Sequence, residues 1–239
     1  LYPLDGLPDR KLDPEKGYQR HPWLQRQDDF SQIDRHPSLR QRRMAVAAYF
    51  GLCTYVDALI GEVVDTLDDL GLADNTRIVY TSDHGDNVGA RGMWGKSNLY
   101  QESAGVPLIL SGPDVPEGEV CETPVSLLDT YQTVLQAVGL KPTDEEWTLS
   151  GRSWFETAGA DYDPDRIVFS EYHAAQSPTG AFMIRRGDFK LNYYVDYYPE
   201  FFDLKKDPEE TQNVADDPAY EAHVREYMAA LREICDPEA

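Results

Sequence analysis

The feature that most constrains the fold is an apolar repeat between Leu39 and Leu70 that is followed closely by a strand signal. Apolar side chains recur there every three or four residues, at Val46, Tyr49, Cys53, Val56, Ile60, Val63, Leu67 and Leu70. This spacing predicts one long helix, with Gly71 as its C-cap. The β-branched run Arg77–Ser82 (RIVYTS) then predicts a short strand of the kind that is buried in parallel sheets.

A second strand and a second helix follow a glycine-rich loop. The sequence Asp83–Asp86 (DHGD) comes directly after the first strand, and three glycines follow within nine residues of it. Val106–Leu110 predicts the second strand, and Leu127–Val138 predicts the second helix, which Gly139 ends. This order of elements predicts an α/β fold whose sheet is flanked by helices and is at least partly parallel.

The pattern changes after Gly151, where short apolar runs are joined by turns. Four strands are predicted, at Ile167–Ser170, Ala181–Arg185, Phe189–Tyr194 and Phe201–Leu204. Ala219–Ile234 predicts a terminal amphipathic helix. We therefore expect a small antiparallel sheet covered by one helix, and two domains, residues 1–155 and 156–239. Residues 1–38 carry prolines and aromatics in irregular order, which predicts an extended segment laid over a surface.

Composition and charge exclude several classes of partner. Lys and Arg total 22 against 43 Asp and Glu, a net charge of -21, which repels phosphate backbones and anionic lipid. No unbroken apolar run approaches the ~20 residues of a membrane span, so no membrane segment is expected. Three scattered cysteines, Cys53, Cys121 and Cys235, are too few for a disulfide framework or zinc cluster. Free thiols favour a reducing compartment such as the cytoplasm.

The candidate site lies just beyond the first strand. Ligands of open α/β sheets bind beyond the carboxyl ends of the strands, where Asp83 and His84 are found. A carboxylate and an imidazole in one turn can converge on one divalent cation. The alternative is that Asp83 caps the turn and His84 is a partly buried polar residue. Lys96 offers a point charge to an anionic group, or is simply a solvated loop lysine.

The stretch Asn75–Ser111 resembles the sulfatase family of the alkaline phosphatase superfamily. It carries TSDHG, then GMWGK, then VPLI, an ordered set of motifs. Val125–Asp129 (VSLLD) and Phe201–Leu204 (FFDL) followed by DPEE are similar to later landmarks of that family, so the resemblance covers roughly residues 39–235. The segments SEYH and RRGDFK are similar to its choline-sulfatase-like branch. The resemblance implies part of an alkaline-phosphatase-like sheet, followed by a smaller subdomain.

The resemblance also implies roles for four residues. Asp83 and His84 match metal-site residues, expected around Ca²⁺, with Mn²⁺ or Mg²⁺ as alternatives. Lys96 matches the lysine that contacts the sulfuryl oxygens. His173 is a candidate for the substrate mouth, with a structural role as the alternative. The implied substrate is a small-molecule or carbohydrate sulfate ester.

The resemblance implies further groups that these residues do not supply. Sulfatases of this type make a formylglycine nucleophile from the first residue of C/S-x-P-x-R, and none of the three cysteines fits; after Cys235 and Pro237, Ala239 stands where Arg is needed. An early Asp-Asp pair completes the metal site, but the pairs at 28–29, 68–69 and 216–217 have the context of solvated acids.

We therefore expect the C-terminal portion of a sulfatase, with nucleophile and first metal carboxylates in an N-terminal portion outside this chain, and little or no activity for the chain alone. Two alternatives remain open. One is a phosphoryl or phosphonate monoester hydrolase of the same superfamily. The other is a non-catalytic binding protein on this scaffold.

Overall fold

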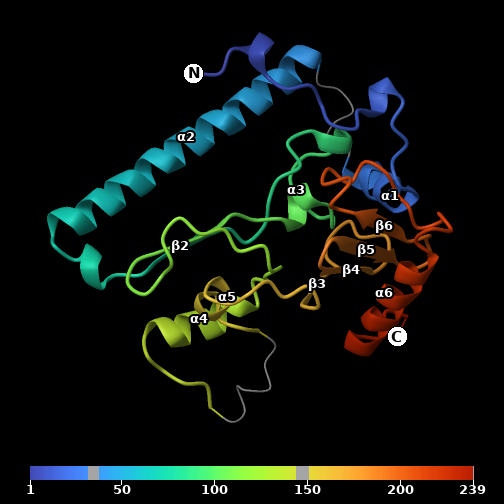
Figure 1. Ribbon diagram of the computed structural model, residues 1–239. Helices are drawn as coiled ribbons and strands as arrows, with labels where there is room; N and C mark the ends of the chain where they lie inside the picture. Colours follow the sequence, from blue (N-terminus) through green and yellow to red (C-terminus); the bar gives the residue numbers. More distant parts are fainter. Residues whose placement is uncertain (32–37, 144–150, 239) are drawn as a thin grey trace.

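The structure is a computed structural model that describes residues 1–31, 38–143 and 151–238 (Figure 1). The helices are α1 (Pro22–Ser31), α2 (Leu39–Asp69), α3 (Gln101–Ala104), α4 (Asp129–Ala137), α5 (Trp154–Ala158) and α6 (Glu221–Ile234). The strands are β1 (Ile78–Thr81), β2 (Leu108–Ser111), β3 (Ile167–Tyr172), β4 (Ala181–Arg186), β5 (Phe189–Tyr194) and β6 (Glu200–Asp203). In the described residues they form two sheets, of orders β1-β2 and β3-β4-β5-β6.

Helix α2 confirms the helix predicted from the apolar repeat. It begins at a capping box, in which the Ser38 side chain accepts the N–H of Gln41 and the Gln41 side chain accepts the N–H of Ser38. Gly71 adopts a φ of +64°, which lets the chain leave the helix as predicted. The helix lies at the periphery of the molecule, and none of its residues is buried.

The strands β1 and β2 lie where the sequence predicts them, but the predictions of a parallel and buried strand were wrong. The pair is antiparallel, with Val79 opposite Leu110 and Tyr80 opposite Ile109. The side chains of Val79, Tyr80 and Ile109 are exposed. Residues 82–107 contain only a 3₁₀ turn at Ala90–Gly92 and the short helix α3, and no crossover helix, so the chain returns beside β1 in the opposite direction. A β-branched composition predicts a strand, but it carries no information on the direction of the neighbouring strand.

The predicted small antiparallel sheet with a terminal helix is confirmed. Strands β3 to β6 form a meander in which each strand pairs antiparallel with the next. Helix α6 covers one face, where Tyr227 and Leu231 pack with Ile184, Leu191 and Phe201.

The N-terminal segment differs from the extended chain that was predicted, because Pro22–Ser31 forms helix α1. Trp23 and Leu24 are fully buried and pack with Tyr194 and Phe202 of the second sheet. Proline suits the first position of a helix, where no N–H is needed. Among the described side chains of this ten-residue helix the two buried apolar ones are adjacent, which offers too little periodicity for detection in the sequence.

The three Asp-Asp pairs behave differently from one another. Residues 68–69 and 216–217 are exposed, as predicted. Asp28 is not the solvated acid that was predicted, because it is buried and its Oδ2 lies 2.6 Å from Nη1 of Arg20. The side chain of Asp29 lies outside the described part of the chain. The Asp28 ion pair fixes α1 against the segment that precedes it.

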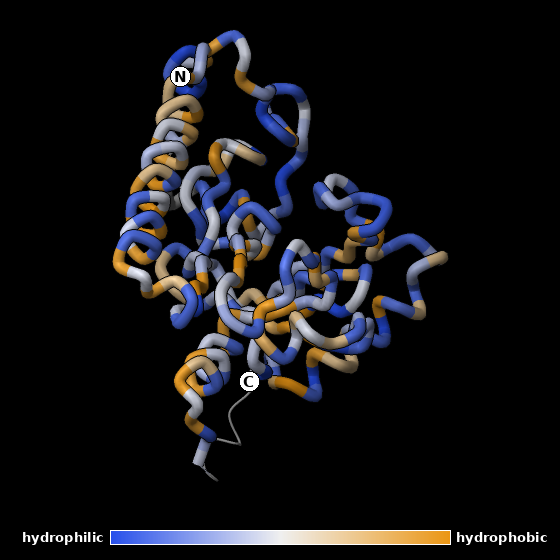
Figure 2. Tube along the Cα trace, turned by 60° about the vertical axis from the view of Figure 1, so that its left-hand side comes forward, coloured by the Kyte–Doolittle hydropathy of each residue, from blue (hydrophilic) through white to orange (hydrophobic). Residues whose placement is uncertain are grey.

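By length and composition alone, α2 meets the criterion for a helix that could cross a membrane. An 18-residue window of it has a mean hydropathy of 1.5 and is 0% buried (Figure 2). The expectation of no membrane segment counted only unbroken apolar runs, and it stays a prediction. A core helix of a soluble protein passes the same test.

One hydrophobic core joins the two predicted domains. Met93 and Leu99 from the glycine-rich loop pack in the same cluster as Ala181 and Met183 of β4. The loop that carries Lys96 is therefore held directly against the second sheet. The division into residues 1–155 and 156–239 stays a prediction.

Candidate functional site

The candidate site begins at the turn after β1. The Ser82 hydroxyl donates to the carbonyl of His84 at 2.9 Å, and Oδ1 of Asp83 accepts the N–H of His84 at 3.0 Å. These two local bonds hold the turn, and the Asp83 side chain remains 84% exposed. Asp83 thus stabilises the turn and also presents an exposed carboxylate. The turn-capping and metal-binding interpretations of this residue are therefore compatible.

The His84 ring has a defined orientation. Its Nδ1 lies 2.8 Å from the carbonyl oxygen of Gly85, which can only accept, so Nδ1 carries the proton of the neutral ring. The lone pair therefore belongs to Nε2, which lies 3.4 Å from Oδ2 of Asp83. This is the arrangement of metal-binding histidines, in which a backbone carbonyl fixes the nitrogen that does not bind the metal.

The structure brings Lys96 to the same point. Its Nζ lies 2.8 Å from Nε2 of His84, across twelve residues of loop. Nε2 of His84 therefore lies close to both other side chains, 3.4 Å from Oδ2 of Asp83 and 2.8 Å from Nζ of Lys96. Their functional roles stay predictions.

Gly85 is required by a close approach between two segments. A Cβ placed there would lie 2.1 Å from the carbonyl oxygen of Glu102 and 2.9 Å from that of Gly105. The N–H of Gly85 donates to the carbonyl of Ser103 at 2.8 Å. Only a residue without a side chain lets the Asp83–His84 turn dock on the end of α3.

The loop between His84 and Lys96 is closed by polar residues that the sequence analysis missed. Oδ1 of Asp86 accepts the N–H groups of Val88 and Gly95, at 2.8 and 3.2 Å. The Asn87 side chain donates to the carbonyl of Gly95 at 2.7 Å, and Asn98 donates to Oδ1 of Asn87 at 3.1 Å. The sequence signal that could have predicted this loop closure is the pair Asp86-Asn87 at the start of the loop, because Asp and Asn favour turns.

Two arginines hold the loop, of which Arg91 is fully buried and Arg20 is partly buried. Arg20 donates to the carbonyls of Arg91 and Gly92, at 2.6 and 3.1 Å. Arg91 is fully buried, pairs with Oε2 of Glu102 at 2.8 Å, and stacks 3.7 Å above the ring of Tyr100. Its Nη2 also donates to the carbonyls of residues 209 and 210. The segment that follows β6 thus supports the loop that positions Lys96.

His173 contacts a different set of residues from the other candidates. Its Nε2 is 3.3 Å from Oε2 of Glu171, and its ring lies edge-on to Phe182 at 4.9 Å. No contact among the described residues links it to Asp83, His84 or Lys96. Its role at the substrate mouth stays a prediction.

Other features bear on what the chain supplies. The three cysteines are free, as predicted, with Cys53 and Cys121 exposed. Within the described ranges, no group of three or more His, Cys, Asp or Glu side chains could hold a metal ion.

A cavity of about 500 Å³ lies between the N-terminal segment, the start of α2 and loop residues 87–94. Arg42, Trp94 and Glu102 line it, whereas Asp83, His84 and Lys96 do not.

Comparison with known proteins decides the family. Residues 16–140, more than half of the chain, match the family model described as Sulfatase. The chain belongs to the sulfatase family. Residues 89–236 of this sulfatase chain also match the model described as N-sulphoglucosamine sulphohydrolase, C-terminal.

Individual relatives agree with this assignment. Arylsulfatase K of Danio rerio is 35% identical over 178 residues, which are 71% of this chain and 33% of the relative. The choline-sulfatase of Rhizobium meliloti (strain 1021) is 36% identical over 176 residues, 74% of this chain and 34% of the relative.

Solved structures share the fold. The phosphonate monoester hydrolase SpPMH from Silicibacter pomeroyi superposes with a TM-score of 0.79 at 27% identity, covering 98% of this chain and 52% of that one. A structure described as a complex with its substrate D-glucosamine-2-N,6-O-disulfate gives 0.70 at 25% identity, covering 89% and 45%. The sulfatase chain therefore spans about a third of these curated relatives and about half of these solved chains.

Proposed function

We propose that the protein to which this chain belongs hydrolyses a sulfate monoester at a divalent-metal site completed by a preceding N-terminal portion. The observation that carries the proposal is the convergence of Asp83, His84 and Lys96 in a chain of the sulfatase family. The expected formylglycine nucleophile and the first metal carboxylates belong to that N-terminal portion.

The donor set fits a hard or borderline divalent cation. Oδ2 of Asp83 is an exposed carboxylate oxygen, and the Nε2 lone pair of His84 lies 3.4 Å from it. Oxygen ligands suit Ca²⁺ and Mg²⁺, and imidazole adds affinity for Mn²⁺. We expect Ca²⁺ first. The ion would polarise the sulfuryl oxygens as a Lewis acid.

The chain's own residues have separate tasks in this proposal. The carbonyl of Gly85 keeps the His84 ring in the tautomer that presents Nε2. Lys96 donates from Nζ to a sulfuryl oxygen and offsets the negative charge that grows during transfer. The loop bonds at Gly95 hold the Lys96 backbone, so that its ammonium group reaches the same small volume as Nε2.

The leaving group is left open between small-molecule and carbohydrate esters. One relative is named a choline-sulfatase, and one solved neighbour was described with a glucosamine disulfate substrate. A phosphonate monoester hydrolase is the second candidate function, because one such enzyme superposes over 98% of this chain.

Kinetics of the longer polypeptide that includes the N-terminal portion test the proposal. Wild type should hydrolyse 4-nitrophenyl sulfate better than a phosphonate monoester of 4-nitrophenol; the reverse order would favour the second candidate. Asp83→Ala should lower the metal content measured by atomic emission and abolish turnover. Normal metal content and rate in that variant would remove Asp83 from the site.

The role of Lys96 needs its own variant. Lys96→Ala should lower kcat/KM by a factor equivalent to about 2–4 kcal/mol, by analogy with removal of one oxyanion donor. Lys205→Ala is the matched control, because Lys205 is an exposed lysine in the turn after β6. Equal rates for both variants would show that Lys96 does not touch the reacting group.

A further inference from the structure

Glu210 is a buried acid in an unusual backbone conformation. It exposes 2% of its surface and has a φ of +53°, in the left-handed region that disfavours residues with a side chain. Glycine would suit this backbone better, so contacts of the glutamate must offset the strain. In the sequence Glu210 ends the DPEE segment after β6, to which the proposed function assigns no task.

The two carboxylate oxygens of Glu210 contact different parts of the fold. Oε1 lies 2.5 Å from Nζ of Lys190, a lysine of β5 that exposes 1% of its side chain. Oε2 accepts the N–H of Gln101, the first residue of α3, at 2.7 Å. The N-cap position of α3 holds Tyr100, which is not a capping residue type. Glu210 therefore supplies the acceptor at the start of this helix from 109 positions away in the sequence.

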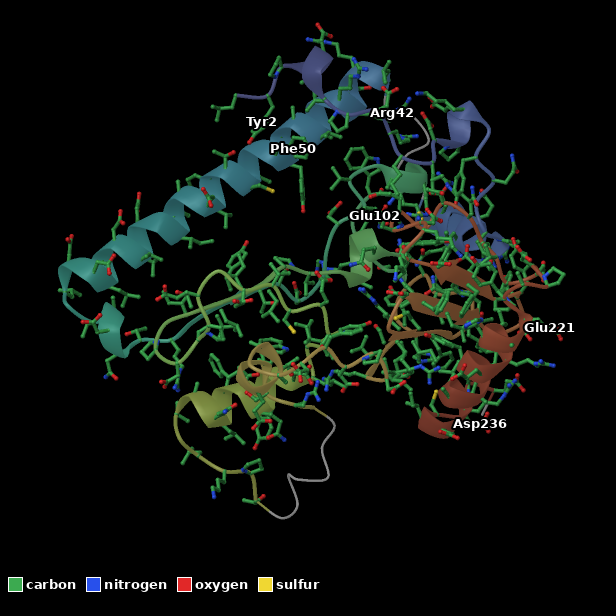
Figure 3. All side chains as sticks on the ribbon, viewed as in Figure 1. Tyr2, Arg42, Phe50, Glu102, Glu221 and Asp236 are labelled. Carbon is green, nitrogen blue, oxygen red and sulfur yellow. The ribbon has the colours of Figure 1, made fainter. Side chains whose placement is uncertain are left out.

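Helix α3 passes this support on to the turn that carries His84. The carbonyl of Ser103 accepts the N–H of Gly85 at 2.8 Å, and the carbonyl of Glu102 lies where a Cβ of Gly85 would be. The carbonyl of Gly85 in turn fixes the His84 ring through Nδ1. Figure 3 labels Glu102 on this short helix. The helix thus connects the Glu210 carboxylate to the imidazole of the site.

The backbone of Glu210 supports the Lys96 side of the same loop. Its carbonyl accepts a hydrogen bond from Nη2 of Arg91 at 3.0 Å. Arg91 is fully buried and belongs to the loop that joins His84 to Lys96. One residue therefore contacts the supports of both side chains, whose Nε2 and Nζ atoms lie 2.8 Å apart.

We propose that Glu210 is a positioning residue that sets the relative placement of His84 and Lys96. This inference rests on the proposed function, in which the two side chains act at one sulfuryl group. The bond to the N–H of Gln101 carries the positioning, and the ion pair with Lys190 holds the carboxylate in place for it. Misplacement of a reacting group by about 1 Å costs roughly a hundredfold in rate, so small shifts of α3 are expected to matter.

A proline at position 101 tests the bond without touching Glu210. Gln101→Pro removes the N–H and leaves the pair with Lys190 intact. Proline suits the first position of a helix, and Tyr100 before it already has the extended ψ of 160° that proline requires. Gln101→Ala is the matched reference, because it removes the same side chain and keeps the N–H.

Two readouts are compared between these variants. In the chain itself, Gln101→Pro should shift the Nε2 ¹⁵N resonance of His84 relative to Gln101→Ala, and leave that of His173, at the end of β3, unchanged. In the longer polypeptide that includes the N-terminal portion, Gln101→Pro should lower kcat at least about tenfold relative to Gln101→Ala. The KM should stay within about twofold, because Lys96 and the metal site act on charge that develops in the transition state.

A second pair of variants approaches the same bond from the acid. Glu210→Gln combined with Lys190→Met keeps an acceptor for the N–H of Gln101 and leaves no buried ammonium unpaired. Glu210→Met combined with Lys190→Met removes the acceptor in the same uncharged surroundings. The first combination should behave like Gln101→Ala, and the second should reproduce the kcat loss and the His84 shift of Gln101→Pro. Urea unfolding measures the stability of all four variants.

The outcomes separate positioning from stability. A lower kcat and a shifted His84 resonance, with KM and the His173 resonance unchanged, support the inference. Variants that unfold at lower urea concentration but keep kcat and the His84 resonance overturn it, because Glu210 then serves stability alone. A wild-type polypeptide that hydrolyses no sulfate ester contradicts the proposed function, and the His84 resonance then decides by itself whether Glu210 orients the ring.

Discussion

The Nζ atom of Lys96 lies 2.8 Å from Nε2 of His84, although twelve positions separate the two residues in the sequence. The contact exists because Gly85 binds His84 on the other ring nitrogen and the loop bonds at Gly95 turn Lys96 back toward β1. A lysine can only donate, so the nitrogen that faces it must be the unprotonated one.

This geometry predicts the tautomer of His84. Long-range ¹H–¹⁵N correlation spectra should show a protonated Nδ1 and an unprotonated Nε2 for the neutral ring. Lys96→Met should shift the Nε2 resonance of His84 and leave that of His173 unchanged. A protonated Nε2 in the neutral ring would contradict the proposed metal-binding orientation.

The second prediction concerns Gly85. Gly85→Ala should destabilise the chain by roughly 1–3 kcal/mol or more, because the new methyl group meets backbone oxygen of Glu102 that cannot move aside. Gly61→Ala is the control: no atom lies within 4 Å of its Cβ position, and alanine favours the helix by up to about 1 kcal/mol. Urea unfolding measures both, and equal stabilities would remove the close-approach argument.

The third prediction concerns the buried Arg91. Arg91→Met should cost about 3–5 kcal/mol in unfolding free energy, since it removes the ion pair with Glu102 and the bonds to two carbonyls. Arg91→Lys should recover only part of this, because a single ammonium cannot reproduce the planar fork. Arg225→Met, which removes an exposed pair with Glu221, should change stability by less than about 1 kcal/mol.

The fourth prediction is a pH dependence set by His21. Burial lowers the pKa of His21 from 6.5 to about 4. The N–H of Trp23 points at its Nδ1 at 3.2 Å, so the folded state resists a second ring proton. Because the unfolded chain takes up that proton near pH 6.5, the stabilising contribution is complete above pH 6.5 and is lost as the pH falls toward 4.

Thermal unfolding across pH 4–7 measures this contribution. His21→Asn should flatten the pH dependence of stability by at most about 1.4 kcal/mol per pH unit, relative to wild type. An unchanged slope in His21→Asn would show that other groups cause the dependence.

Sequence alone predicted those elements whose signal is local. The repeat in α2, the glycine that ends it, and the short apolar runs of β4 and β5 are each encoded within a few residues. The order TSDHG, GMWGK and VPLI likewise identified the family and the residues that gather at the site. Helix α1 was not predicted, because the residues that bury it, Tyr194 and Phe202, are far away in the sequence.

Tertiary structure decided what depends on partners distant in sequence. The antiparallel direction of β1 and β2 follows from the path of residues 82–107, and the burial of Asp28 and Arg91 follows from partners that no local pattern names. Helix α2 illustrates the same difference between what local sequence and tertiary structure determine. Periodicity established that the helix has an apolar face, whereas only the packed chain revealed that its own residues leave that face uncovered. Local spacing sets the conformation of a segment, and free energy gained over long sequence separations sets where that segment lies.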